Sequence, residues 1–254
     1  MPKTKIVYHD RYLTDYPTAS VEVPERVKSI HKELSAHGYK FVTPKPAIDA
    51  DILLVHKMRL IESEKRDKER YETALLSAGG AIAASEIAIE GTPAFGLIRP
   101  PGHHASPDSN WGFCFFNNTA ISVEKLIVQK KIERALILDI DLHFGDGTDN
   151  FFKGRDDVTV VNVQSNYALE FLAMTKEGLE KSAPYDIVCV SAGFDRYVKD
   201  WGGTLDTKDY RTIGELVKEY SEKHAKGRRY ALLEGGYYIK DLGINARNLI
   251  EGME

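Results

Sequence analysis

The sequence predicts an α/β fold of three layers, in which a mainly parallel sheet is flanked by helices. The chain is 254 residues long, which suits one large domain with a substantial core, so we expect residues 1–254 to form a single domain. Short apolar runs typical of strands recur along the chain, and segments with the helical spacing of apolar residues separate them. Strands that alternate with helices indicate a parallel sheet, because each connecting helix packs back onto a face of the sheet.

The expected elements follow from these patterns in order. A helix should begin near Pro24 and end at Gly38, since Val27, Ile30 and Leu34 form one apolar face between them. The other expected helices are residues 73–89, residues 118–130 and the segment that carries Tyr210, Ile213, Val217 and Tyr220. The expected strands are residues 5–8, 94–98, 135–140, 158–163, 186–191 and 230–233.

Composition excludes several classes of protein. The formal net charge of -4 gives no electrostatic reason to expect direct binding to nucleic acid. Two cysteines, Cys114 and Cys189, cannot form a disulfide framework, and their spacing matches no cysteine-based zinc site. Residues 1–5 lack the apolar stretch of a signal peptide, and no apolar run approaches the length of a membrane span. We therefore expect a cytoplasmic protein with no membrane partner.

Polar side chains and glycines gather directly after four of the expected strands. The segments are residues 99–105, 139–147, 192–196 and 234–237. The carboxyl ends of parallel strands meet at one edge of the sheet, and ligands bind there. We therefore expect these four segments to build one functional site.

A metal site is the first expectation within these segments. Asp141 and His143 can reach one ion after the strand at 135–140, with Asp195 arriving from a neighbouring strand. Two carboxylates and one imidazole leave a coordination position open for water, as in catalytic zinc sites. The same donors tolerate Fe²⁺ or Co²⁺. The alternative for such a strand-end aspartate is a structural one, capping the next helix.

Acid–base chemistry is the second expectation. The adjacent residues His103 and His104 suit proton transfer, and Asp139 and Asp146 are carboxylates that could orient them. Tyr237 follows two glycines, and its hydroxyl could donate a hydrogen bond to a developing oxyanion, although core tyrosines are common.

Together these segments resemble the histone deacetylase family, which includes acetylpolyamine amidohydrolases and acetoin-utilisation proteins. The matching segments are residues 24–26, 99–105, 112–118, 139–147, 191–196 and 235–237, in family order. The resemblance implies an arginase/deacetylase-like fold and a single deacetylase-like catalytic domain. The implied activity is metal-dependent removal of acetyl groups from amines, with a small acetylated amine or an acetyl-lysine side chain as the substrate; the oligomeric state stays open.

The resemblance also implies a role for each matched position. It places a monovalent cation such as K⁺ on the backbone around residues 139–143. It implies that Asp141, His143 and Asp195 bind Zn²⁺. It implies that His104 is the general base, oriented by Asp146, and that His103 is its electrostatic partner, oriented by Asp139. It further implies that Tyr237 polarises the acetyl carbonyl and that Gly112 and Phe113 line the acyl channel.

The chain departs from the family pattern in its loops. The long loop that usually follows the strand at 158–163 is missing, and with it one aromatic wall of the channel, for which Tyr167 and Phe171 are replacement candidates. The region between His56 and Tyr71 is also short, so we expect an open channel with few rim contacts. Phe144 stands where many members have another histidine.

Two alternatives to a deacetylase remain open at this stage. The chain could bind acetylated amines without turnover. It could also be a two-metal ureohydrolase of the related arginase-like architecture, but Gly145 and Tyr197 occupy the positions where the carboxylates for a second metal would stand.

Overall fold

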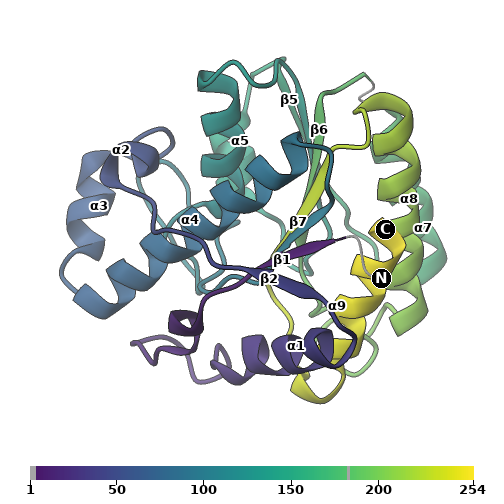
Figure 1. Ribbon diagram of the computed structural model, residues 1–254, viewed down its shortest axis with the longest axis horizontal. Helices are drawn as coiled ribbons and strands as arrows, with labels where there is room; N and C mark the ends of the chain where they lie inside the picture. The colour runs from purple at the N-terminus through teal and green to yellow at the C-terminus, as the bar shows by residue number, and fades with distance from the viewer. Residues whose placement is uncertain (1–3, 182–183) are drawn as a thin grey trace.

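A computed structural model describes residues 4–181 and 184–254 of the protein. In this part of the chain seven strands form one sheet in the order β2-β1-β3-β7-β6-β4-β5, and every neighbouring pair is parallel (Figure 1). The predicted three-layer, mainly parallel α/β fold is confirmed. The strands are β1 (Lys5–Val7), β2 (Lys40–Val42), β3 (Ala94–Gly96), β4 (Ala135–Asp139), β5 (Val158–Asn162), β6 (Ile187–Ala192) and β7 (Arg229–Leu233).

Helices cover both faces of this sheet. One layer contains α4 and α5, and the other contains α1, α9, α8 and α7 (Figure 1). The helices are α1 (Glu25–Ala36), α2 (Asp49–Ile52), α3 (Met58–Glu64), α4 (Lys68–Ile89), α5 (Asn118–Val128), α6 (Asp146–Phe152), α7 (Ala168–Lys181), α8 (Thr207–His224) and α9 (Ile239–Met253), with a short 3₁₀ turn, η1, at Asp10–Leu13.

The expected strands all form, within a few residues of their predicted ends, but β2 was not foreseen. It is an edge strand of three residues whose side chains are exposed or half-buried. An edge strand of this kind does not need a continuous apolar run, so the sequence carries little signal for it.

Helix ends follow local capping chemistry. Pro24 is the N-cap of α1, and Gly38 adopts φ +76° just after its end, a conformation that favours glycine. The helix α4 begins at Lys68 rather than at the expected residue 73, because the Asp67 side chain caps it by accepting a hydrogen bond from Arg70 N at 3.0 Å.

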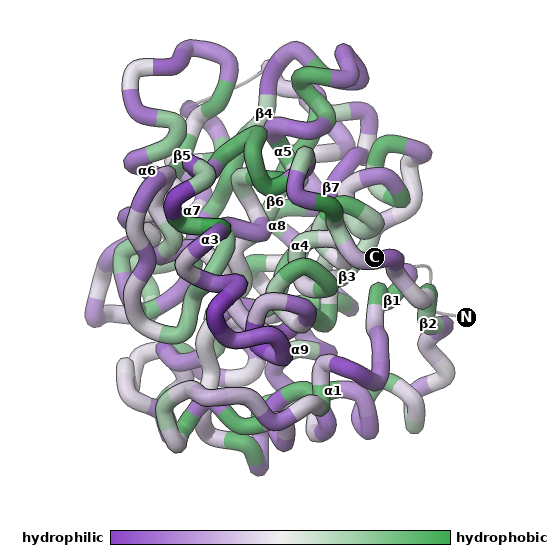
Figure 2. Tube along the Cα trace, turned by 90° about the vertical axis from the view of Figure 1, so that its left-hand side faces the viewer, coloured by the Kyte–Doolittle hydropathy of each residue, from purple (hydrophilic) through white to green (hydrophobic). Residues whose placement is uncertain are grey.

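The core is continuous through the sheet. Every residue of β4 and β6 is buried, and Figure 2 shows hydrophobic stretches of the chain in the middle of the molecule, where these strands are labelled. The helix α4 is long and apolar enough, by length and composition, to cross a membrane, although the sequence predicted no such span. However, core helices meet the same criteria, and 67% of its most apolar window is buried, against α5 and the strands β1, β3 and β7.

The buried side chain of His56, which precedes α3, is hydrogen-bonded to the loop between β3 and α5. Its Nδ1 lies 2.9 Å from Ser106 O, and its Nε2 accepts a hydrogen bond from Asn117 N at 2.8 Å. This arrangement needs the neutral ring, since a protonated Nε2 could not accept. Burial lowers the pKa of His56 from 6.5 to about 4, although the bond to Ser106 opposes the shift.

We expect His56 to make the fold sensitive to acid. As the pH falls below 6.5, the unfolded chain takes up a proton that the folded chain refuses until about pH 4. This contribution to stability is therefore complete above pH 6.5 and is lost down to pH 4, by about 3 kcal/mol in total. Urea unfolding across this range should give a steeper loss of stability for the wild-type chain than for His56→Gln. Equal slopes would contradict the assignment.

Candidate active site

Three of the four polar segments line one pocket of about 90 Å³ at the carboxyl edge of the sheet, and the fourth places Asp195 in contact with His143 of the pocket wall. They arrive there after β3, β4, β6 and β7, as parallel strands require. The side chains and glycines that line the pocket are Pro101, His103, His104, Trp111, Gly112, Phe113, Cys114, Asp141, His143, Trp201, Gly235 and Tyr237.

The structure brings Asp141, His143 and Asp195 together. One ligand atom from each lies within 4.8 Å of the others. His143 Nδ1 is 3.3 Å from Asp141 Oδ1 and 3.1 Å from Asp195 Oδ2. The two carboxylates are fully buried, whereas the side chain of His143 is 40% exposed, so the cluster is open on the side of the imidazole.

Backbone N–H groups hold the two carboxylates in place. Asp141 accepts hydrogen bonds from His143 N at 2.9 Å and from Gly235 N at 2.8 Å, and Asp195 accepts one from Leu142 N at 3.0 Å. Gly193 and Gly235 pack directly against the Asp141 carboxylate, where a Cβ on either would collide with it. Gly193 and Gly235 are therefore required by close approach to Asp141.

This donor set fits a divalent cation. Burial, together with the negative charge of Asp141, raises the pKa of Asp195 to about 6. Two carboxylates this close together and away from water are stabilised by a positive ion between them. Two carboxylate oxygens and an imidazole nitrogen are also the ligands that zinc and similar ions take in catalytic sites.

Two histidine–aspartate pairs lie beside the cluster. His103 Nδ1 is 2.9 Å from Asp139 Oδ2, and His104 Nδ1 is 2.7 Å from Asp146 Oδ1. The two imidazole rings are 4.0 Å apart between centroids. Each pair is the one that the family resemblance implied.

The two rings have opposite electrostatic surroundings. Burial disfavours the charged form of His103, but the carboxylates of Asp139 and Asp141 outweigh it and hold its pKa well above the ordinary value. Burial and the charge of His103 lower the pKa of His104 to about 4. Near neutral pH His103 is therefore protonated and His104 is neutral. Since His104 Nδ1–H donates to Asp146, its Nε2 is free to take a proton.

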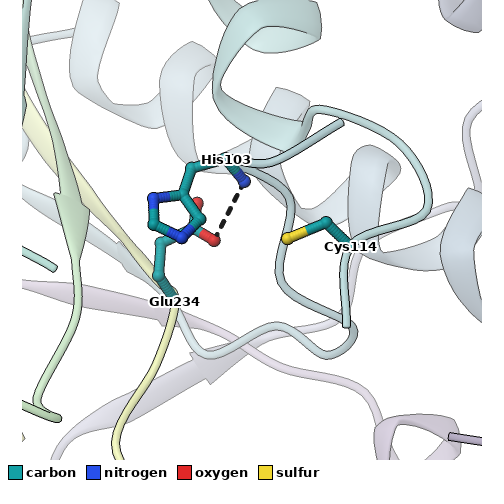
Figure 3. A group of neighbouring side chains, drawn as sticks. All are labelled: His103, Cys114 and Glu234. Atoms are coloured by element: carbon teal, nitrogen blue, oxygen red, sulfur yellow. Dashed lines mark hydrogen bonds between the residues drawn. The ribbon is translucent and has the colours of Figure 1, made fainter. Parts of the chain in front are cut away.

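Glu234 anchors the loop that carries these histidines. Its Oε2 accepts hydrogen bonds from Gly102 N at 2.8 Å and His103 N at 3.2 Å, and Figure 3 shows its carboxylate and the Cys114 thiol beside the His103 ring. His103, Cys114 and Glu234 also have ligand atoms within 4.8 Å of one another. Burial, however, raises the pKa of the Cys114 thiol and raises that of Glu234 to about 7. The thiol therefore keeps its proton and the Glu234 carboxyl is only partly ionised near pH 7, so Asp141, His143 and Asp195 are the better set for an ion.

Tyr237 and Phe113 face each other across the pocket with ring centroids 5.7 Å apart. Burial raises the pKa of Tyr237 more than nearby Arg26 lowers it, so the hydroxyl keeps its proton. Gly112 adopts φ +65° and lies against the His104 ring, which gives the pocket its turn between Trp111 and Phe113.

The sequence analysis missed both tryptophans of the pocket. Trp201 stacks on Tyr237 at 4.2 Å between centroids. The Trp111 ring lies 3.7 Å from the His104 ring between centroids, and its Nε1–H donates to Asp146 Oδ2 at 2.8 Å. The Asp146 carboxylate therefore accepts from His104 and Trp111 together. The signal was present in the sequence, since these are its two tryptophans and both adjoin the motifs.

The expected replacements for the missing channel wall were wrong. Tyr167 is 74% exposed and Phe171 is fully buried, and neither lines the pocket. Trp201 supplies an aromatic wall instead, from the loop after the Asp195 segment.

An arginine side chain reaches the backbone around residues 139–143, where the resemblance implies K⁺. Arg196, which is 1% exposed, donates to Asp141 O at 3.1 Å and to Leu142 O at 3.3 Å. A guanidinium of this chain therefore engages carbonyl oxygens that a bound monovalent cation would need.

The two positions where carboxylates for a second metal would stand, Gly145 and Tyr197, carry none. Gly145 N donates to Asn162 Oδ1 at 2.8 Å, and Tyr197 directs its hydroxyl away to Asp241 Oδ2, also at 2.8 Å. This geometry gives no support to a two-metal ureohydrolase.

Comparison with known proteins agrees with this geometry. The family model described as the histone deacetylase domain matches residues 20–171, more than half of the chain. A histone deacetylase-like amidohydrolase of Pseudomonas aeruginosa is 28% identical, over 91% of this chain and 77% of the relative. A probable deacetylase of Archaeoglobus fulgidus is 30% identical, over 93% of this chain and 82% of the relative. Acetylpolyamine amidohydrolase 1 of P. aeruginosa is 33% identical, over 72% of this chain and 62% of the relative.

The fold is also that of a solved relative. The crystal structure of acetylpolyamine aminohydrolase from Burkholderia pseudomallei superimposes with a TM-score of 0.86 and covers 98% of both chains, at 22% identity. With the family model matched over more than half of its length and a 30% identical relative aligned over most of both chains, this chain belongs to the histone deacetylase domain family.

Proposed function

We propose that this chain is a zinc-dependent deacetylase that hydrolyses the amide bond of acetylated amines. The observation that carries the proposal is the cluster Asp141, His143 and Asp195 beside the neighbouring rings of His103 and His104, at one small pocket. Membership of a family whose members are named deacetylases and amidohydrolases supports the reaction class.

Asp141, His143 and Asp195 would hold the ion, and their donors suit Zn²⁺ and also accept Fe²⁺ or Co²⁺. A bound ion of this kind supplies a Lewis acid, which polarises a carbonyl oxygen and makes water more acidic.

His104 is the proposed acid–base group. Its neutral ring presents Nε2 toward the pocket, where it would take the proton from the attacking water and then return it to the nitrogen of the departing amine. Asp146 holds the ring in the required tautomer. Proton transfer by a positioned group contributes about 10²–10⁴-fold to a rate.

His103 and Tyr237 are the proposed stabilisers of negative charge. His103 lies between Asp139 and Asp141 and stays protonated. It would therefore place a positive charge beside the reacting centre without giving up its proton. The Tyr237 hydroxyl would donate a hydrogen bond to the acetyl oxygen as that oxygen becomes negative.

The walls of the pocket favour a straight apolar chain next to the acetyl group. Phe113, Trp111, Trp201 and Tyr237 offer aromatic surface, and acetyl-lysine and acetylated polyamines both carry their acetamide on a chain of methylene groups. The names of several relatives refer to acetylpolyamines. Short loops at the rim favour small acetylated amines over one particular peptide sequence.

The reaction is tested by acetate release from a panel of acetyl-lysine, acetylated peptides of varied sequence and acetylated polyamines. Zinc-reconstituted protein should release acetate, and His104→Ala should lower kcat by about 10²–10⁴-fold, since it removes the proton acceptor. The variant should retain its ion, and the exposed-residue control His37→Ala should be unchanged. No acetate from any substrate with folded, ion-loaded protein would refute the proposed function.

Asp195→Ala should remove the ion. Elemental analysis of the wild-type protein should find about one divalent ion per chain. Among the described residues two groups could hold a metal ion, and the one that contains Cys114 is the poorer set of ligands. The variant should lose both the ion and acetate release, whereas Asp157→Ala, in a surface ion pair with Arg155, should lose neither. Stoichiometric ion with normal turnover in folded Asp195→Ala protein would exclude this ligand set.

Tyr237→Phe should act on turnover more than on binding. Removal of one oxyanion donor lowers kcat by about 10²–10³-fold, and KM should change much less because the hydroxyl matters most when charge develops. Tyr238→Phe is the matched control, since Tyr238 adjoins Tyr237 without lining the pocket. If the two variants have equal kcat values, the proposed role of Tyr237 is wrong.

A further inference from the structure

Arg196 is a buried cation at the back of the candidate metal cluster. It follows Asp195 directly in the chain, and its side chain donates to backbone carbonyl oxygens of two other loops. Nε donates to Asp141 O at 3.1 Å, and Nη2 donates to Leu142 O at 3.3 Å and to Val163 O at 3.1 Å. Nη1 donates to Ser165 O at 2.9 Å, so that four carbonyl oxygens surround one guanidinium.

These contacts join the loops that follow three adjacent strands of the sheet. Asp141 and Leu142 follow β4, Val163 and Ser165 follow β5, and Arg196 itself follows β6. The β4 loop carries Asp141 and His143, and the β6 loop carries Asp195. One positive charge therefore fastens together the two loops that provide all three candidate metal ligands.

A ring of carbonyl oxygens is what a monovalent cation such as K⁺ binds in proteins. Here those oxygens already accept hydrogen bonds from a group of the same charge, beside the buried carboxylates of Asp141 and Asp195. An arginine stays protonated at any pH at which proteins fold, so this charge is permanent.

The short segment after β5 completes the enclosure. The Phe171 ring, on α7, lies 4.9 Å from the guanidinium carbon, a cation–π contact. Residues 163–171 run from β5 into α7 without a long excursion, so both Ser165 O and Phe171 reach the arginine. The missing loop and the buried arginine are therefore parts of one arrangement.

We propose that Arg196 replaces an exchangeable monovalent cation in this chain. It positions Asp141, His143 and Asp195 through the backbone, and the site needs no K⁺ or Na⁺ from solution. The inference rests on the proposed function only in taking these three residues as the metal ligands. It concerns ion binding and stability, so it can be tested whether or not acetate is released.

The first measurement uses the wild-type chain. Its zinc affinity and its melting temperature should be the same in potassium, sodium and choline chloride at equal ionic strength. Loss of a residue that supports a metal ligand typically lowers metal affinity by about 10-fold or more. A zinc affinity higher in potassium than in choline by more than this factor would overturn the proposal. This measurement does not depend on whether any variant folds.

The second measurement compares variants at Arg196. Arg196→Met keeps much of the side-chain volume without charge, and Arg196→Ala leaves space among the carbonyl oxygens. Both should weaken zinc binding in choline chloride by about 10-fold or more. Potassium should restore zinc binding to Arg196→Ala and should restore it less to Arg196→Met, where the methionine fills the space.

Arg229→Met is the matched control. Arg229 is also buried and donates to backbone carbonyls, Met253 O and Gly227 O, away from the metal cluster. It should melt at a lower temperature and bind zinc as the wild type does. Equal weakening of zinc binding by Arg229→Met, or no potassium effect on folded Arg196→Ala, would show that Arg196 does not replace a cation.

Discussion

The burial of three carboxylates at one edge of the sheet is the constraint on which the rest of the site depends. Asp139, Asp141 and Asp195 lie at the ends of β4 and β6, each 1% exposed or less. A buried negative charge is costly unless hydrogen bonds and positive groups surround it. The adjacent glycines, the backbone N–H groups and the protonated His103 all serve this need, and the divalent ion that we propose for the cluster would serve it too.

A second layer of buried charge supports the opposite side of the pocket. Arg26 donates from Nε to Gly236 O at 2.6 Å and also to Glu234 O, and its guanidinium lies 4.9 Å from the centre of the Tyr237 ring. Glu22 pairs with Arg26 and with Arg99, which reaches it from the segment after β3. The turn that presents Tyr237 is therefore held by charges from α1, not by the sheet alone.

Much of this arrangement could be predicted from the sequence, because the carboxyl ends of parallel strands lie at one edge of the sheet whatever path the connecting loops take. That rule brought together Asp141, His143, Asp195 and the two histidines before any distance was known. The parts that could not be predicted depend on where longer side chains point. Nothing in the order of residues shows that Phe171 turns inward onto Arg196, or that Trp201 turns toward the pocket. The edge strand β2 was missed because half-exposed residues leave little pattern.

The position of the two tryptophans gives the molecule a built-in optical reporter. Trp111 and Trp201 are the only tryptophans of the chain, and both are about half-exposed at the mouth of the pocket. Indole emission is therefore confined to this one place, on a ring in contact with His104 and a ring stacked against Tyr237. Light emitted by the native protein reports the polarity and the occupancy of its pocket, with no label attached.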